Sequence, residues 1–249
     1  MIRPPRAKLE AAVGPLPAAV CWLGLPTAAS ARIAALAGYR LATIDTEHAA
    51  IGPETAAAMI LALRGEGAAA LVRVSGLATG PIQHALDSGA TGIIVPYVET
   101  VAAAEAAVRA FHFPPLGARG QAAAVVAATG YGTDAGYGER WADTGLLALQ
   151  IESRAGLAAA RAIAAVPGVD MLFFGPFDYA QDAGLDPATD GAVLAAAFAD
   201  IVAAAHAADR LAGVFPWPGA SEADLAGADM VARASDIVTL RLGLQATLP

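Results

Sequence analysis

Short apolar segments that alternate with alanine-rich amphipathic segments restrict the fold of this chain more than any other feature. Eight of the apolar segments are predicted to be strands, at 19–23, 41–45, 70–75, 91–96, 146–151, 170–174, 211–215 and 236–240. Predicted helices separate most of them, at 53–64, 80–89, 99–111, 154–166, 190–208 and 220–230. Alternation of this kind is typical of a parallel sheet. Eight strands in 249 residues, with no linker between them, predict one α/β domain over 1–249, a closed (β/α)8 TIM barrel.

Two segments depart from a regular barrel. After the eighth predicted strand only 242–249 remain, which is too short for a normal eighth helix. We therefore expect a partner subunit to complete the barrel at this end, or the end to stay partly open. The segment 114–143 is rich in glycine and long for a connection, which is typical of a functional loop.

The composition argues against several classes of protein. Hydrophobic residues make up 57% of the chain, enough for a large core, yet no apolar run reaches the ~18 residues of a membrane span. We find no signal peptide, and the single cysteine, Cys21, predicts a buried thiol in a cytoplasmic protein. The net charge of −8, with no basic stripe, argues against nucleic acid or an anionic membrane as partner.

The chain has one lysine, Lys8, which precedes the first predicted strand. A Schiff-base mechanism needs a desolvated lysine inside the pocket, so we expect a different means of stabilising a carbanion. The sequence also lacks a phosphate loop, a dinucleotide fingerprint and a G-x-S-x-G elbow. Nucleotide-dependent chemistry and serine hydrolysis therefore lack their usual signals.

Ionisable or polar side chains stand at the ends of several predicted strands. They are Asp45, Glu47, His48, Arg73, Gln150, Glu152 and Asp178. In a barrel the C-terminal ends of all strands meet at one face, so the pattern predicts an active site there. Glu152 and Asp178 should converge from neighbouring strands as hard oxygen ligands for a divalent metal. The same spacing is equally compatible with two helix N-caps.

His48 and Arg73 each allow a catalytic and a structural interpretation. Flanked by Asp45 and Glu47, His48 would have a raised pKa and could act as a general base; otherwise it is a structural hydrogen-bonding group. Arg73 is costly to bury without an anion, so its partner is a substrate carboxylate or enolate, or one of those two carboxylates. The other histidines, His84, His112 and His206, are expected to be structural.

In this order the motifs resemble the HpcH/HpaI aldolase family of class II, metal-dependent pyruvate aldolases, over nearly the whole chain. The matching segments are 22–25, 44–48 (the D-x-E-H segment), 71–74, 86–90, 94–96, 113–120, 150–152 and 175–178. The resemblance implies reversible cleavage of 4-hydroxy-2-oxoacids to pyruvate, or hydroxypyruvate, and an aldehyde through a metal-bound enolate. Decarboxylation of oxaloacetate would be a side activity.

The resemblance also implies roles for individual residues. Glu152 and Asp178 would bind Mg²⁺, Mn²⁺ or Co²⁺, and Arg73 would stabilise the enolate. His48 would transfer protons, assisted by Asp45 and Glu47, with Asp87 as its acidic partner within the chain or across a subunit boundary. The substrate would contact Trp22, Gln150, Phe215 and the amides of Gly175 and Phe177. Relatives are commonly hexamers, so we expect a homo-oligomer whose other partners are the small oxoacid and the aldehyde.

The departures from the family pattern concern the aldehyde site. Tyr179-Ala180 stands where Leu-Ser is usual, 121–129 lacks an arginine, and 215–218 is bulky and rich in proline. They predict a pocket suited to a small neutral aldehyde rather than a semialdehyde acid. Two other functions remain open: a CoA-thioester lyase of the citrate-lyase β-subunit type, which needs a basic surface for CoA, and a non-catalytic oxoacid-binding barrel.

Overall fold

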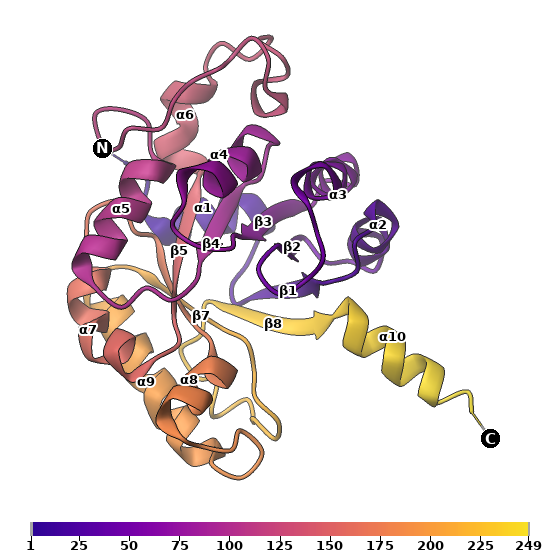
Figure 1. Ribbon diagram of the computed structural model, residues 1–249, viewed down its shortest axis with the longest axis vertical. Coiled ribbons are helices and arrows are strands. Elements are labelled where there is room, and N and C mark those ends of the chain that lie inside the picture. The colour runs from indigo at the N-terminus through magenta and orange to yellow at the C-terminus, as the bar shows by residue number, and fades with distance from the viewer. Residues whose placement is uncertain (1, 249) are drawn as a thin grey trace.

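The computed structural model describes residues 2–248, and its strands form one closed parallel barrel in which β8 pairs with β1 (Figure 1). The strands are β1 Ala18–Leu23, β2 Leu41–Asp45, β3 Ala69–Arg73, β4 Gly92–Val95, β5 Leu146–Ile151, β6 Met171–Phe174, β7 Leu211–Val214 and β8 Met230–Ser235. The helices are α1 Pro5–Val13, α2 Ala28–Leu36, α3 Pro53–Gly65, α4 Thr79–Asp87, α5 Val101–Phe111, α6 Tyr137–Thr144, α7 Arg154–Ala164, α8 Pro176–Ala183, α9 Gly191–Ala207 and α10 Asp236–Gln245. The predicted (β/α)8 TIM barrel is confirmed.

Two apolar layers stabilise the barrel, because successive strand residues point alternately inward and outward. Inward side chains such as Leu71, Ile94 and Phe173 fill the interior, whereas outward ones such as Leu147 and Leu172 pack beneath the helices. The apolar segments read as strands from the sequence are therefore buried on both faces.

Helix α1 closes the end of the barrel where the strands begin. Leu9 joins the interior cluster, and Lys8 forms a buried ion pair with Asp170 just before β6 (Nζ to Oδ1, 2.8 Å). The lysine therefore lies at the end of the barrel opposite the polar strand ends. Cys21 is buried, as expected. The pKa of its thiol is raised to about 11, mainly by burial and to a smaller extent by the negative charge of Asp236.

The predictions for the last part of the chain are wrong in two places. The segment 220–230 forms turns rather than a helix, and strand β8 lies at Met230–Ser235 rather than 236–240. Gly219 and Gly227 both have positive φ angles, which favour turns. The apolar run after Asp236 begins helix α10 because that aspartate accepts the N–H groups of Gly24 and Leu25, which fixes the chain where β8 ends.

Helix α10 projects away from the barrel instead of covering it (Figure 1). None of its residues is buried, and it exposes the side chains Ile237, Val238, Leu240, Leu242 and Leu244. A helix does follow the last strand, contrary to the sequence-based expectation, but it leaves that side of the single chain open. Within residues 2–248, no helix combines the length and apolarity needed to cross a membrane.

Candidate active site

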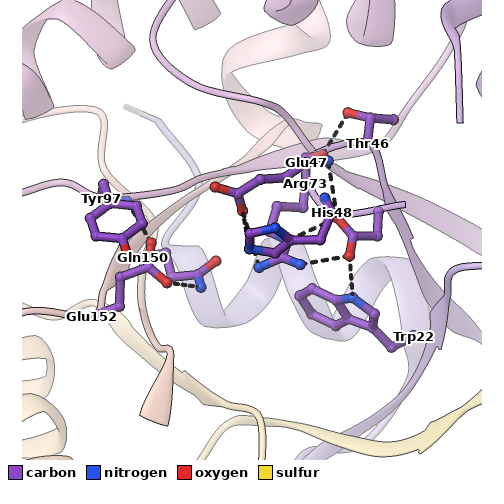
Figure 2. A network of polar contacts seen from close by, with 9 residues as sticks. Trp22, Thr46, Glu47, His48, Arg73, Tyr97, Gln150 and Glu152 are labelled. Carbon is purple, nitrogen blue, oxygen red and sulfur yellow. Dashed lines mark hydrogen bonds and ion pairs between the residues drawn. The ribbon is translucent and has the colours of Figure 1, made fainter. Parts of the chain in front are cut away.

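Four of the polar residues at the strand ends, His48, Arg73, Gln150 and Asp178, line one cavity of about 350 Å³. The cavity is lined by Trp22, His48, Arg73, Gln150, Phe173, Gly175, Pro176, Phe177, Asp178 and Phe215. Figure 2 shows the polar groups in two sets, with Arg73, Glu47 and His48 on one side and Gln150, Glu152 and Tyr97 on the other. The topology thus brings together residues from both halves of the sequence, as the strand-end pattern predicted.

Arg73 is held by two carboxylates of the β2 end. It lies opposite Asp45 in the β2–β3 register and donates to it from Nε (3.1 Å) and Nη2 (2.6 Å). Its Nη1 is 3.1 Å from Glu47 Oε2, and its guanidinium lies 5.0 Å from the ring centroid of Trp22. The ion pairing that the sequence left open is therefore present. Because the guanidinium has five N–H groups and only two donate to Asp45, it can still donate into the cavity.

Asp45 organises the loop that carries His48. Burial would raise the pKa of Asp45, but the hydrogen bonds and charge of Arg73 hold it below its ordinary value. The N–H groups of Glu47 (3.0 Å) and His48 (3.3 Å) also donate to this carboxylate. Asp45 therefore fixes both the backbone of this loop and the guanidinium of Arg73.

The His48 ring lies at the mouth of the cavity and is 60% exposed. Its nearest acidic partner is Glu47, with Nε2 and Oε2 3.8 Å apart. Burial is the main cause of a raised pKa for Glu47, partly opposed by the charges of Arg73 and His48. Glu47 therefore links the histidine to the arginine (Figure 2).

Glu152 is a buried carboxylate whose two oxygen atoms are both held. Its Oε1 accepts the N–H of Tyr97 at 2.7 Å, and its Oε2 accepts a hydrogen bond from Gln150 Nε2 (Figure 2). Burial, together with the charges of Asp178 and Glu47, raises the pKa of Glu152 to about 7. The other amide atom, Gln150 Oε1, is buried without a hydrogen-bond partner.

The structure rules out the helix-cap alternative for Glu152 and Asp178. Ser153 caps α7 by accepting the N–H of Gly156, and Gly175 is the N-cap of α8. Glu152 instead directly follows β5, and Asp178 stands in the first turn of α8, which follows the neighbouring strand β6.

A divalent metal fits this pair of carboxylates. Two like charges, one of them almost fully buried, repel each other unless a cation lies between them, which agrees with the raised pKa of Glu152. Within residues 2–248 no three acidic, histidine or cysteine side chains form a metal cluster, so water and substrate would complete the coordination. A side chain at position 175 would not fit, since a Cβ on Gly175 would lie 2.6 Å from Glu152 Oε2.

Two of the predicted site residues, Gly175 and Asp87, have contacts that the sequence did not indicate. The N–H of Gly175 already donates to the carbonyl of Ile151 at 3.1 Å, whereas the sequence assigned this amide to the substrate. Asp87 pairs with Arg119 (2.8 Å), and within the chain it does not meet His48. The expectation that it acts across a subunit boundary stays a prediction.

An aromatic wall forms another side of the cavity. The ring of Phe215 lies edge-on to Trp22 and to Phe177, with centroids 5.4 Å and 6.0 Å away. Trp22 also donates from Nε1 to Asp45 Oδ2 at 3.3 Å, which fixes the indole against the polar floor. This wall limits the size and polarity of whatever enters beside Arg73.

Sequence reasoning missed Tyr97. It follows β4, has a φ angle of 51°, and its N–H reaches Glu152. Partial burial and the charges of Asp178 and Glu152 raise the pKa of its phenol to about 12. The sequence feature that could have identified Tyr97 as a site residue is its position directly after the strand-end segment Ile94–Pro96.

Comparison with known proteins identifies the family. Residues 18–238 match the profile described as HpcH/HpaI aldolase/citrate lyase. A hydroxypyruvate/pyruvate aldolase from Roseovarius nubinhibens is 34% identical over 92% of this chain and 90% of its own. A 2-dehydro-3,6-dideoxy-6-sulfogluconate aldolase from Pseudomonas putida is 40% identical over 66% of this chain and 64% of its own. The crystal structure of an HpcH/HpaI aldolase/citrate lyase family protein from Burkholderia cenocepacia superposes with a TM-score of 0.86, 31% identity and 96% coverage of both chains. The chain belongs to the HpcH/HpaI aldolase/citrate lyase family.

Proposed function

We propose that this enzyme is a metal-dependent aldolase that reversibly cleaves a 4-hydroxy-2-oxoacid to pyruvate, or hydroxypyruvate, and an aldehyde. The observation that carries the proposal is a pair of carboxylates beside the anchored guanidinium of Arg73: Asp178 lines the same cavity, and the buried Glu152 lies directly behind it, hydrogen-bonded to the lining residue Gln150. A divalent cation held by the two carboxylates and the guanidinium of Arg73 would both suit a substrate whose carbonyl oxygen gains negative charge during the reaction. The hydroxypyruvate/pyruvate aldolase that aligns with 92% of the chain supports this choice of donor.

Glu152 and Asp178 would hold Mg²⁺, Mn²⁺ or Co²⁺, which would supply Lewis-acid polarisation of the oxoacid carbonyl. Gln150 and the first turn of α8 would orient the oxoacid. Pro176 has no N–H group, so the amide of Phe177 is the first in this turn that can face a carboxylate. Gly175 has no Cβ, which allows the side chains of Glu152 and Gln150 to pack against the start of α8.

Arg73 would stabilise the negative oxygen that develops when the donor loses a proton. Its contacts with Asp45, Glu47 and Trp22 fix the guanidinium before substrate binds, which is the arrangement that makes such stabilisation effective. His48 would exchange protons with the aldehyde oxygen at the mouth, with Glu47 beside it. Oxaloacetate decarboxylation would require the same stabilisation by Arg73.

The aldehyde would bind against Trp22, Phe177 and Phe215. Among the described residues that line the cavity, the basic side chains are Arg73, already paired with two carboxylates, and the exposed His48. The carboxylate of an acidic aldehyde would therefore find no unpaired, buried basic side chain among these residues. A small neutral aldehyde suits this part of the cavity better. Steady-state kinetics should give higher kcat/KM with glycolaldehyde or glyceraldehyde than with succinic semialdehyde; the reverse order would contradict this assignment.

A homo-oligomer completes the proposal, with a hexamer as the family resemblance implies. The exposed apolar side chains of α10 would be costly in water, and a second copy of the chain would cover them.

Substitution of the carboxylates tests the proposed function. Glu152→Ala and Asp178→Ala should each abolish aldol cleavage and Mn²⁺ binding while the circular dichroism spectrum stays that of a folded barrel. Full activity in either variant would remove the metal from the mechanism.

A further inference from the structure

The side-chain amide of Gln150 has one atom with a partner and one without. Gln150 belongs to β5, lines the cavity and is only 2% exposed. Its Nε2 donates to Glu152 Oε2, whereas its Oε1 is buried and has no hydrogen-bond partner among residues 2–248. A buried acceptor without a partner lowers stability, so an atom left in this state at a binding cavity points to a hydrogen bond made with a ligand.

Contacts of the amide nitrogen fix the direction in which Oε1 points. The nitrogen donates to Glu152, and a Cβ on Gly175 would lie 2.7 Å from it, so Nε2 packs against the start of α8. Rotating the amide by half a turn would place Oε1 against Glu152, which as an ionised metal ligand has no proton to donate. Oε1 therefore faces the other way, toward the side that holds Arg73 and His48 (Figure 2).

The N–H groups on that side point to the carboxylates of the β2 end. Arg73 donates from Nε and Nη2 to Asp45, and its Nη1 lies 3.1 Å from Glu47 Oε2. Trp22 Nε1 also donates to Asp45. These contacts hold the donors away from Gln150, so the hydrogen bond to Oε1 would come from the molecule that enters the cavity.

An acceptor oxygen at this place separates two kinds of oxoacid. The pyruvate ion has acceptor oxygens and a methyl group, but no O–H or N–H that could donate to Oε1. A 3-hydroxy-2-oxoacid such as hydroxypyruvate has the same carboxylate and ketone, and it carries one hydroxyl on the carbon next to the ketone. We propose that Gln150 selects a donor substrate of this second kind by accepting the hydrogen bond of its hydroxyl.

The inference rests on the proposed function, in which Glu152 and Asp178 hold the metal to which the oxoacid binds. A site that forms a hydrogen bond with a substrate hydroxyl discriminates against the analogue without it, because the buried group of the protein is then left unpaired. For one neutral hydrogen bond we expect a preference of about 10-fold.

Steady-state kinetics of aldol addition with one aldehyde and either donor test the proposal. Gln150→Met keeps the length of the side chain and removes both polar atoms. Loss of the Nε2 contact acts through Glu152 and should affect both donors equally, whereas loss of Oε1 should affect hydroxypyruvate alone. The ratio of kcat/KM for hydroxypyruvate to kcat/KM for pyruvate should therefore fall about 10-fold. Gln181→Met, at an exposed position of α8, is the matched control and should keep the wild-type ratio.

A comparison of ligands on the wild-type protein tests the same point without any substitution, so it holds even where Gln150→Met does not fold. In 2-oxobutyrate a methyl group replaces the hydroxyl of hydroxypyruvate at similar size. Calorimetry with saturating Mg²⁺ should give a Kd about 10-fold lower for hydroxypyruvate than for 2-oxobutyrate. Equal Kd values would overturn the role of Gln150.

The outcomes separate this inference from the proposed function. An unchanged kcat/KM ratio in an active Gln150→Met would overturn the selection by Gln150 and leave the aldolase assignment in place. Absence of metal-dependent deuterium exchange at C3 of both pyruvate and hydroxypyruvate in the wild type would overturn the proposed function, and this inference with it.

Discussion

Replacing Glu152 with glutamine should change how the stability of the metal-free protein depends on pH. Burial, with the charges of Asp178 and Glu47, raises the pKa of Glu152 from 4.5 to about 7. The folded protein therefore keeps this proton up to about pH 7, whereas the unfolded chain loses it near pH 4.5. Between these values the folded state binds more protons, so a rise in pH lowers the free energy of unfolding.

The size of the effect follows from the two pKa values. At about 1.4 kcal/mol for each pH unit, the interval from 4.5 to about 7 corresponds to a loss of about 3 kcal/mol. The stabilisation is complete below pH 4.5 and is lost by about pH 7. The glutamine of Glu152→Gln has a similar shape and does not titrate, so it should escape this loss.

Urea unfolding of both proteins in EDTA, from about pH 4.5 to pH 8, measures the difference. The free energy of unfolding of Glu152→Gln minus that of the wild type should increase by about 3 kcal/mol across this range. Glu105→Gln, at an exposed position of α5, is the control and should run parallel to the wild type. A constant difference between Glu152→Gln and the wild type would refute the assignment of a buried, protonated Glu152.

Three further predictions concern Arg73, Lys8 and α10. Arg73→Ala should lower kcat/KM for aldol cleavage by about 10² to 10³, as loss of one oxyanion donor does, and a wild-type value would remove Arg73 from the reaction. Lys8→Met should leave Asp170 without its buried partner and lower the free energy of unfolding in urea by about 3–5 kcal/mol, with kcat unchanged; loss of activity in the folded variant would contradict its placement away from the site. Truncation after Ser235 should lower the mass measured by light scattering, whereas an unchanged mass would mean that α10 is not the subunit contact.

The sequence predicted seven of the eight strands because their signal is local. A strand that is buried on both faces has a recognisable local pattern, a short apolar run bounded by turn residues, which does not depend on the rest of the chain. The signal failed near the C-terminus, where Ile237, Val238 and Thr239 form a β-branched run typical of a strand but lie in α10. The contact that decides this is between Asp236 and the amides after β1, more than 200 residues earlier, and no local pattern contains it.

The convergence of strand-end residues on one cavity was predictable for a topological reason, but the pairings among these residues were not. Once the chain is a barrel, every polar residue at a strand's C-terminal end reaches the same face. Whether Arg73 faces Asp45 depends on strand register, and whether Asp87 meets Arg119 depends on the path of a long loop. Tyr97 was missed because an aromatic residue after a strand resembles core, and its left-handed conformation has no sequence signature.

Exchange of the methyl protons of pyruvate in D₂O, followed by NMR, tests the central claim most directly because it needs no knowledge of the aldehyde. We expect no exchange with EDTA-stripped enzyme and rapid exchange after Mg²⁺ or Mn²⁺ is added. The exchange should be lost in Asp178→Ala. Absence of exchange with either metal, or equal exchange in EDTA, would contradict a metal-dependent pyruvate aldolase at this cavity.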